Sequence, residues 1–170
     1  MNVILIGYRG SGKTSVGRLL AEKLGLRFVD TDVLIVERAG KTIKEIFAGE
    51  GEAGFRDRES AVISDVCKQD GQVIASGGGA ILRPQNVTAM EAAGTIVWLE
   101  ADAETLFARI NADAGTTANR PNLTSTGGLE EVRHILAHRT PIYEAAADLA
   151  INVAKLSPTE IVAKIAADLT

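Results

Sequence analysis

The chain has 170 residues, of which 46% are hydrophobic and 24% charged, and its formal net charge at pH 7 is −4. This length suits one compact domain, and the composition excludes a disordered, collagen-like or low-complexity chain. The acidic balance argues against a broad surface for nucleic acid, although a local cluster of arginines could still bind a small anion.

The sequence predicts neither a secretory leader nor a membrane span. Only two residues precede the apolar run at residues 3–6, whereas a signal peptide needs a basic leader and a longer apolar stretch. No run approaches the roughly 18 apolar residues of a membrane helix. Cys67 is the only cysteine, which excludes an internal disulfide and a cysteine-based zinc site and indicates a reduced core residue. We therefore expect a cytoplasmic protein with neither nucleic-acid nor membrane partners.

Short apolar runs alternate with helical segments along the chain. Strands are predicted at residues 3–6, 28–29, 73–75, 95–99 and 149–153, where β-branched residues are frequent and the runs are too short for helices. Helices are predicted at residues 13–24, 52–68, 103–111, 129–147 and 158–169. Near-continuous apolarity within the strands is typical of a parallel sheet covered on both faces. The alternation therefore predicts an α/β domain with right-handed crossovers.

A glycine-rich loop follows the first predicted strand. Residues 7–14 read G-Y-R-G-S-G-K-T and match the phosphate-loop pattern G-x-x-x-x-G-K-[ST] without a mismatch, between a strand and a helix. Such glycines let backbone N–H groups converge on phosphate oxygens, and the helix N-terminus adds its positive end. Lys13 is predicted to reach the β- and γ-phosphates and Thr14 to ligate Mg²⁺. The expected nucleotide site comprises Gly10, Ser11, Gly12, Lys13, Thr14 and Ser15.

Two aspartates follow the second predicted strand. Asp30 and Asp32 are two residues apart, so on an extended chain they point into the same crevice at the strand ends. One carboxylate could hold the water shell of Mg²⁺, and the other could draw the proton from an acceptor hydroxyl. Either aspartate alone could instead cap the next helix. Two of them beside a phosphate loop favour the functional interpretation.

The segment at residues 111–128 lacks the periodic pattern of its neighbours. It is rich in Gly, Thr, Asn and Ala, and Arg120 is its only basic residue. Long loops without structure of their own are often lids or binding loops, although some are tolerated surface insertions. We expect a lid that carries Arg120.

Three further features stand out: F-R-D-R-E at 55–59, S-G-G-G-A at 76–80 and R-T-P-I-Y at 139–143. Arg56 and Glu59 are three residues apart on a predicted helix, which is also the spacing of an ordinary surface ion pair. The glycines either let the backbone approach a ligand or form a tight turn. Arg139, taken alone, is expected to be solvated on a polar helix.

Together these segments resemble the shikimate kinases, small phosphate-loop kinases of the nucleoside-monophosphate-kinase type. The matching pieces are G-x-x-G-S-G-K-T at 7–14, V-D-T-D at 29–32, I-x-x-I-F-x-x-x-G-E at 43–52, F-R-x-x-E at 55–59, G-G-G-A at 77–80, R-P at 120–121 and R-x-P-x-Y at 139–143. The phosphate loop alone would indicate only a superfamily. The complete set, in this order and spacing, covers nearly the whole chain and is far more specific.

The resemblance implies a three-layer α/β/α fold with a five-stranded parallel sheet in the order 2-3-1-4-5. It implies one domain over residues 1–170, with an acceptor-binding segment at about 31–61 and a lid at about 111–128. The implied reaction transfers the γ-phosphoryl group of ATP, with Mg²⁺, to the 3-hydroxyl of shikimate, on the route to chorismate and the aromatic amino acids. Members of the family are mostly monomeric, so a monomer is expected.

The resemblance also implies a role for individual residues. Lys13, Asp32 and Arg120 correspond to the catalytic residues, and Asp30 corresponds to an aspartate that holds Mg²⁺ through water. The acceptor would be bound by Asp32, Arg56, Gly77, Gly78, Gly79 and Arg139, with Glu59 orienting Arg56. A guanidinium suits this task because it grips a carboxylate bidentately. Arg109 would lie against the adenine, and Arg120 would reach the transferred phosphoryl group.

Two alternatives remain open at this level. Another small-metabolite kinase, acting on gluconate or a nucleoside monophosphate, would share the scaffold, and gluconate also carries a carboxylate. A catalytically inactive binding module would keep the fold. The intact Lys13, Thr14, Asp30, Asp32 and Arg120 speak against that second alternative.

Overall fold

A parallel β-sheet forms the centre of this computed structural model, which describes residues 1–112 and 127–170. Within those residues the sheet has five strands in the order β2-β3-β1-β4-β5, and every neighbouring pair is parallel. The strands are β1 (Asn2–Ile6), β2 (Arg27–Asp30), β3 (Gln72–Ala75), β4 (Gly94–Glu100) and β5 (Leu149–Asn152). The predicted strand order and parallel pairing are confirmed.

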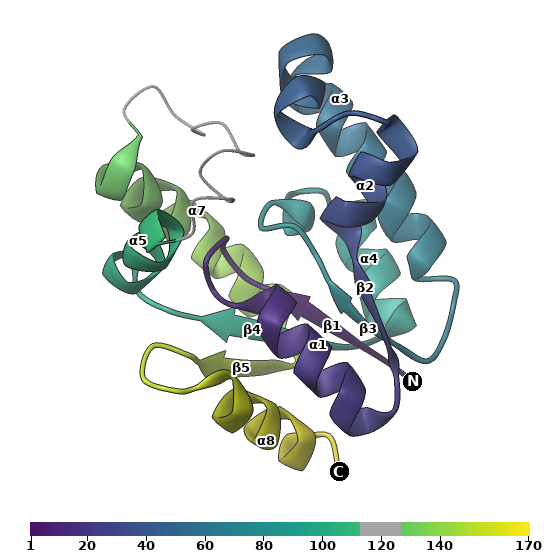
Figure 1. Cartoon of the computed structure of the whole chain (residues 1–170), viewed down its shortest axis with the longest axis vertical. Helices are drawn as coiled ribbons and strands as arrows, with labels where there is room; N and C mark the ends of the chain where they lie inside the picture. Colours follow the sequence, from purple (N-terminus) through teal and green to yellow (C-terminus); the bar gives the residue numbers. More distant parts are fainter. Residues whose placement is uncertain (113–126) are drawn as a thin grey trace.

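Helices cover both faces of the sheet, which gives three layers (Figure 1). They are α1 (Lys13–Leu24), α2 (Thr31–Ala39), α3 (Ile43–Val66), α4 (Pro84–Ala93), α5 (Ala103–Ala112), α7 (Gly128–Ala146) and α8 (Pro158–Asp168), with a short 3₁₀ turn, η1, at Ala80–Leu82. Helices α1 and α8 pack together on one face, while α3 and α4 pack on the other.

The central strand shows why the strands are apolar throughout. Val3 and Leu5 point into the core beneath α1 and α8, whereas Ile4 and Ile6 point into the core beneath α3 and α4. All four side chains are completely buried. Successive side chains of a strand alternate between faces, so a strand covered on both sides needs an apolar residue at every position.

Helices α2 and α4 are absent from the sequence prediction, and α3 begins nine residues before the predicted start at residue 52. Helix α2 begins directly after β2 because Asp30 caps it, accepting hydrogen bonds from the backbone N–H groups of Asp32 and Val33. Helix α3 contains several glycines, and non-helical angles at Gly51 divide it at a kink. These glycines weaken the periodic signal by which a helix is recognised in sequence.

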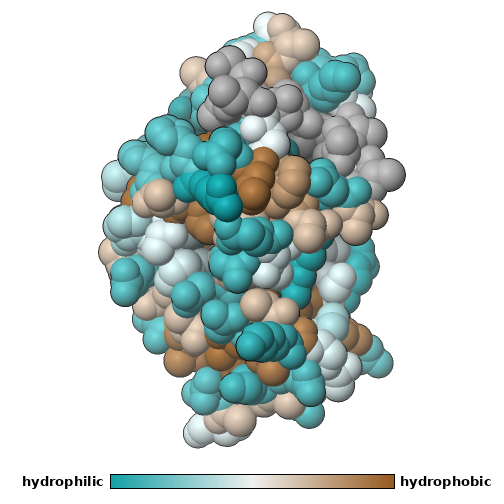
Figure 2. Space-filling model, turned by 90° about the vertical axis from the view of Figure 1, so that its left-hand side faces the viewer, coloured by the Kyte–Doolittle hydropathy of each residue, from teal (hydrophilic) through white to brown (hydrophobic). Residues whose placement is uncertain are grey.

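The molecular surface mixes hydrophilic and hydrophobic residues on the side where α5 and α7 lie (Figures 1 and 2). Across residues 1–112 and 127–170, no helix combines the length and apolarity that crossing a bilayer requires. Cys67 is half-buried rather than fully in the core, and burial raises the pKa of its thiol to about 11.

Candidate active site

The carboxyl ends of β1, β2 and β3 meet at a cavity of about 280 Å³ beside the phosphate loop. Parallel α/β sheets bind ligands at this edge because the loops there converge. The cavity is lined by Arg9, Gly10, Gly12, Lys13, Thr14, Ser15, Asp30, Asp32, Ala75, Ser76, Gly77, Gly78, Arg109 and Ile110. Sequence motifs from residues 7–14, 29–32, 76–80 and the end of α5 are thus brought together.

The phosphate loop has the geometry of an anion cradle. Gly10 and Gly12 adopt φ values of 85° and 96°, which side-chain-bearing residues rarely adopt. The Nζ atom of Lys13 donates to the carbonyl oxygens of Gly7 at 2.6 Å and Tyr8 at 3.0 Å, so the lysine folds back over the loop. Helix α1 begins at Lys13 and directs its N-terminus at the cavity, and Ser11, within the loop, is buried.

Asp30 uses its two carboxylate oxygens for different tasks. Oδ1 caps α2, and Oδ2 accepts a hydrogen bond of 3.1 Å from the hydroxyl of Thr14. The expectation that Asp30 and Asp32 lie on one extended chain is wrong, because the cap starts α2 at Thr31. Asp30 therefore caps α2 and also lines the cavity. A hydroxyl and a carboxylate at one point also offer the hard oxygen ligands that suit Mg²⁺.

Asp32 lies in the first turn of α2 and is partly buried. A Cβ atom placed on Gly77 would be 3.1 Å from Oδ1 of Asp32, so this carboxylate lies against the glycine turn that follows β3. Asp32 and Asp30 line the same cavity, as predicted, although a helical turn rather than an extended strand places them there.

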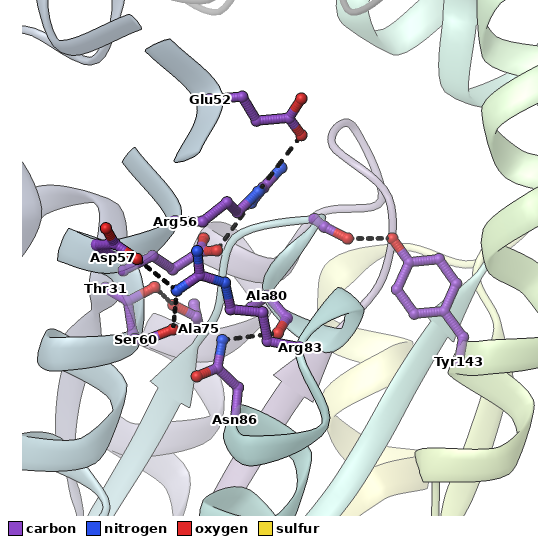
Figure 3. Close-up of polar contacts among 12 residues, drawn as sticks. Thr31, Glu52, Arg56, Asp57, Ser60, Ala75, Ala80, Arg83, Asn86 and Tyr143 are labelled. Atoms are coloured by element: carbon purple, nitrogen blue, oxygen red, sulfur yellow. Dashed lines mark hydrogen bonds and ion pairs between the residues drawn. The ribbon is translucent and has the colours of Figure 1, made fainter. Parts of the chain in front are cut away.

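Arg56 and Glu59 form a buried ion pair on α3. The Nη1 atom of Arg56 lies 2.7 Å from Oε1 of Glu59, and their side chains are 10% and 0% exposed. Glu52 approaches the same guanidinium from the solvent side, at 3.7 Å (Figure 3). Burial raises the pKa of Glu59, and the charge of Arg56 opposes that rise. The reading of Arg56 and Glu59 as a surface ion pair is therefore wrong.

The glycine triplet is tightly packed against charged side chains. A Cβ on Gly77 would lie 2.7 Å from Oε2 of Glu59, and one on Gly79 would overlap the Arg56 guanidinium. A Cβ on Gly78 would lie 3.3 Å from the backbone nitrogen of Arg9. The triplet both forms a turn and lets these groups approach the backbone, so glycine is favoured here because a side chain would collide with its neighbours.

Arg139 enters this region from α7, and its side chain is buried rather than solvated as expected for this residue alone. Its Cζ atom lies 5.8 Å from the centre of the Tyr8 ring. Its Nη1 atom is 3.6 Å from the position a Cβ on Gly78 would take. Arg56 and Arg139 thus reach the glycine turn from two different helices.

Arg9 is a site residue that the sequence interpretation missed. It lines the cavity, and its Nη2 atom lies 3.3 Å from Oε2 of Glu131, whose side chain is 1% exposed. The phosphate-loop pattern leaves this position unspecified, and Glu131 looks in sequence like an ordinary acidic residue of a helix's first turn. The signal in the sequence that could have identified Arg9 is its position as a basic residue inside the phosphate loop.

Arg109 lines the cavity together with the phosphate loop, and its predicted position against the adenine stays a prediction. Its guanidinium donates to the carbonyl oxygen of Val153 at 3.0 Å and reaches that of Ser11 at 3.5 Å. The predicted lid at 111–128, with Arg120, falls almost entirely outside the described residues. In the described ranges, no group of three or more His, Cys, Asp or Glu residues could hold a metal ion.

The fold and this site define the chain as a phosphate-loop kinase. The phosphate loop and Asp32 line the cavity, and the buried Arg56 and Arg139 lie outside its lining, against the glycine turn. Residues 9–170 match the family model described as shikimate kinase. The chain therefore belongs to the shikimate kinase family. The predicted family and its activity, ATP-dependent phosphorylation of shikimate in aromatic amino acid biosynthesis, are confirmed, whereas the gluconate and nucleoside monophosphate alternatives gain no support.

Individual relatives agree with the family match. The chain is 46% identical over 165 residues to a shikimate kinase of Symbiobacterium thermophilum, covering 97% of this chain and 94% of that protein. It is 44% identical over 164 residues to one of Rhodopirellula baltica, covering 96% and 88%. The solved structure of shikimate kinase from Acinetobacter baumannii in complex with shikimate matches with a TM-score of 0.93 and 35% identity, over 99% of this chain and 92% of that one.

Proposed function

We propose that this chain transfers the γ-phosphoryl group of ATP to the 3-hydroxyl of shikimate at the described cavity. The observation that carries the proposal is the convergence of Arg56, Arg139 and Asp32 on one glycine turn next to the phosphate loop. Two guanidinium groups suit the single carboxylate of shikimate, and a carboxylate suits a hydroxyl that must lose its proton.

The nucleotide side of the proposal rests on the phosphate loop. Lys13 and the loop N–H groups hold the phosphates, because a helix N-terminus and a lysine together neutralise their charge. Arg109, on α5, would lie against the adenine, and its position in the cavity lining close to the Ser11 carbonyl supports this role. Arg120 is proposed to approach the transferred group from outside the described residues.

Mg²⁺ fits the contact between Thr14 and Asp30. The Thr14 hydroxyl would ligate the ion directly, and Asp30 would hold it through water, in keeping with the few protein ligands that Mg²⁺ takes. When bound, the ion supplies neutralisation of phosphate charge.

Asp32 is proposed as the residue that handles the acceptor proton. The 3-hydroxyl donates a hydrogen bond to the Asp32 carboxylate and passes its proton there as its oxygen attacks the γ-phosphorus. The bond between that phosphorus and the oxygen bridging to the β-phosphate breaks, and ADP leaves with the electron pair. Lys13 stays on the phosphates and stabilises the charge that shifts toward ADP.

Substitution of the two arginines tests the acceptor site. Arg56→Ala and Arg139→Ala should each raise the KM for shikimate by about tenfold or more, because a charged hydrogen bond contributes about 1.5–3 kcal/mol, while the KM for ATP changes little. Arg133→Ala is the matched control, since Arg133 lies on the same helix as Arg139 but pairs with Glu104 and Glu130 at the surface. Equal effects on both KM values would contradict the proposed acceptor site.

A monomer and a cytoplasmic location stay predictions, and sedimentation would check the first.

A further inference from the structure

The R-x-P-x-Y segment places a second polar residue beside Arg139. Tyr143 lies one helical turn after Arg139 on α7, at the i, i+4 spacing that puts two side chains on one face. Its ring is completely buried and stacks on Trp98 of β4, with ring centres 5.7 Å apart. A phenylalanine would satisfy this packing, so the hydroxyl has a separate purpose.

The Tyr143 hydroxyl donates a hydrogen bond of 2.5 Å to the carbonyl oxygen of Gly78, within the glycine turn (Figure 3). The bond joins α7 to a segment 65 residues away in sequence. A carbonyl oxygen can only accept, so the phenol is the donor, and burial, which raises the pKa of Tyr143 to about 12, keeps it in the protonated form.

Gly78 is the point at which three parts of the site meet. A Cβ at this position would lie 3.3 Å from the backbone nitrogen of Arg9, 3.5 Å from the carbonyl oxygen of Gly7 and 3.6 Å from Nη1 of Arg139. A hydrogen bond on the Gly78 carbonyl therefore fixes the glycine turn relative to both the phosphate loop and Arg139. It also fixes the trans peptide plane, so that the N–H of Gly79 points away from Tyr143.

We propose that Tyr143 is a positioning residue for the acceptor, which acts by tying the glycine turn to the helix that carries Arg139. This inference rests on the proposed function, because it takes Arg139 and the glycine turn as the acceptor site. Without the hydroxyl, α7 loses its hydrogen bond to the Gly78 carbonyl, and the Arg139 guanidinium is held less firmly at the distance that suits the acceptor carboxylate. A small displacement of a binding group weakens binding without removing it.

Tyr143→Phe keeps the buried ring and removes only the hydroxyl. We expect the KM for shikimate to rise about three- to tenfold, the range that a neutral hydrogen bond supports, while kcat and the KM for ATP stay within about twofold. Protection of the fold by shikimate against heat should weaken in parallel, while protection by ATP should not. Gln72→Leu is the control, because it removes a buried hydrogen bond to the Val66 carbonyl and a partly buried one to that of Gln69 at the start of β3, the strand end opposite the cavity.

Combining Tyr143→Phe with Arg139→Ala separates a positioning role from a merely structural one. The tyrosine substitution should have little further effect on the KM for shikimate once Arg139 is absent. A full-sized effect in that background, an unchanged KM in the single variant, or the same KM changes in Gln72→Leu would each overturn the inference. If Arg139→Ala itself left the KM for shikimate unchanged, the proposed acceptor site would fail instead, so the two failures are distinguishable.

Discussion

The Arg56 guanidinium and the Glu59 carboxylate lie 2.7 Å apart, and both are shielded from solvent by the glycine turn after β3. A buried ion pair stabilises a fold weakly at best, because desolvation offsets the attraction. Its presence here points to function. The pair fits the role that the family resemblance implies for Glu59, which is to orient Arg56, and that role stays a prediction.

Glu59 should make stability depend on pH. Burial raises the pKa of Glu59 above its ordinary 4.5, so the folded state binds the proton more tightly than the unfolded state. This group's contribution to stability is therefore fully present below the ordinary pKa and is lost as the pH rises through the raised value. Glu59→Gln removes the dependence. In urea unfolding between about pH 4 and pH 7, the unfolding free energy of the variant should rise relative to that of the parent protein as the pH increases. A difference in unfolding free energy that stays constant across this pH range would contradict this expectation.

Gly79→Ala should disturb the acceptor site through space alone. The φ of Gly79 is −101°, which alanine adopts freely, but the new Cβ would overlap the Arg56 guanidinium. We expect a loss of about 1–3 kcal/mol in unfolding free energy and a higher KM for shikimate. Gly49→Ala is the control, because this glycine lies in α3 with nothing within 4 Å of a new Cβ. The explanation fails if both variants behave alike.

Asp32→Asn should slow the chemical step. Removing a general base typically costs about 10²- to 10⁴-fold in kcat, while the phosphate loop remains intact and ATP binding should be kept. Calorimetry with an ATP analogue would measure that binding. Asp65→Asn, an exposed aspartate paired with Arg38, serves as the control. Loss of ATP binding in Asp32→Asn would mean that Asp32 belongs to the nucleotide side.

Cys67 should be a slow thiol. Its pKa of about 11, against an ordinary 9.0, leaves about a hundredfold less thiolate at neutral pH, and the thiolate is the reactive form. A disulfide reagent should therefore modify the folded protein far more slowly than the protein in urea. Equal rates in the two conditions would show that burial does not protect this side chain.

The sequence predicts best where chemistry and local structure coincide. Residues 7–14 specify a strand–loop–helix unit through glycines with positive φ and a lysine at the helix start, and α1 begins and ends where predicted. The sequence predicts correctly that Asp30 and Asp32 lie at one cavity. It does not predict the backbone conformation between them, because an aspartate at the end of a strand and an aspartate that caps a helix look alike in sequence.

Long-range packing explains what the sequence does not predict. The i, i+3 spacing of Arg56 and Glu59 is typical of exposed pairs, and the glycine turn that packs against them lies about twenty residues later in the chain. The contact between Arg9 and Glu131 spans 122 residues, so no local pattern contains it. The strand order 2-3-1-4-5 came from family resemblance, since periodicity gives strands but not their neighbours.

ADP release with Mg²⁺ and ATP, compared among shikimate, gluconate, AMP and no acceptor, tests the central claim most directly. The account predicts acceptor-dependent release with shikimate alone, because two buried arginines and an aspartate face the glycine turn. Release with gluconate or AMP at a similar rate would contradict the acceptor site. Release with none of them, from a protein that ATP still protects against heat, would contradict the catalytic assignment and favour a binding module.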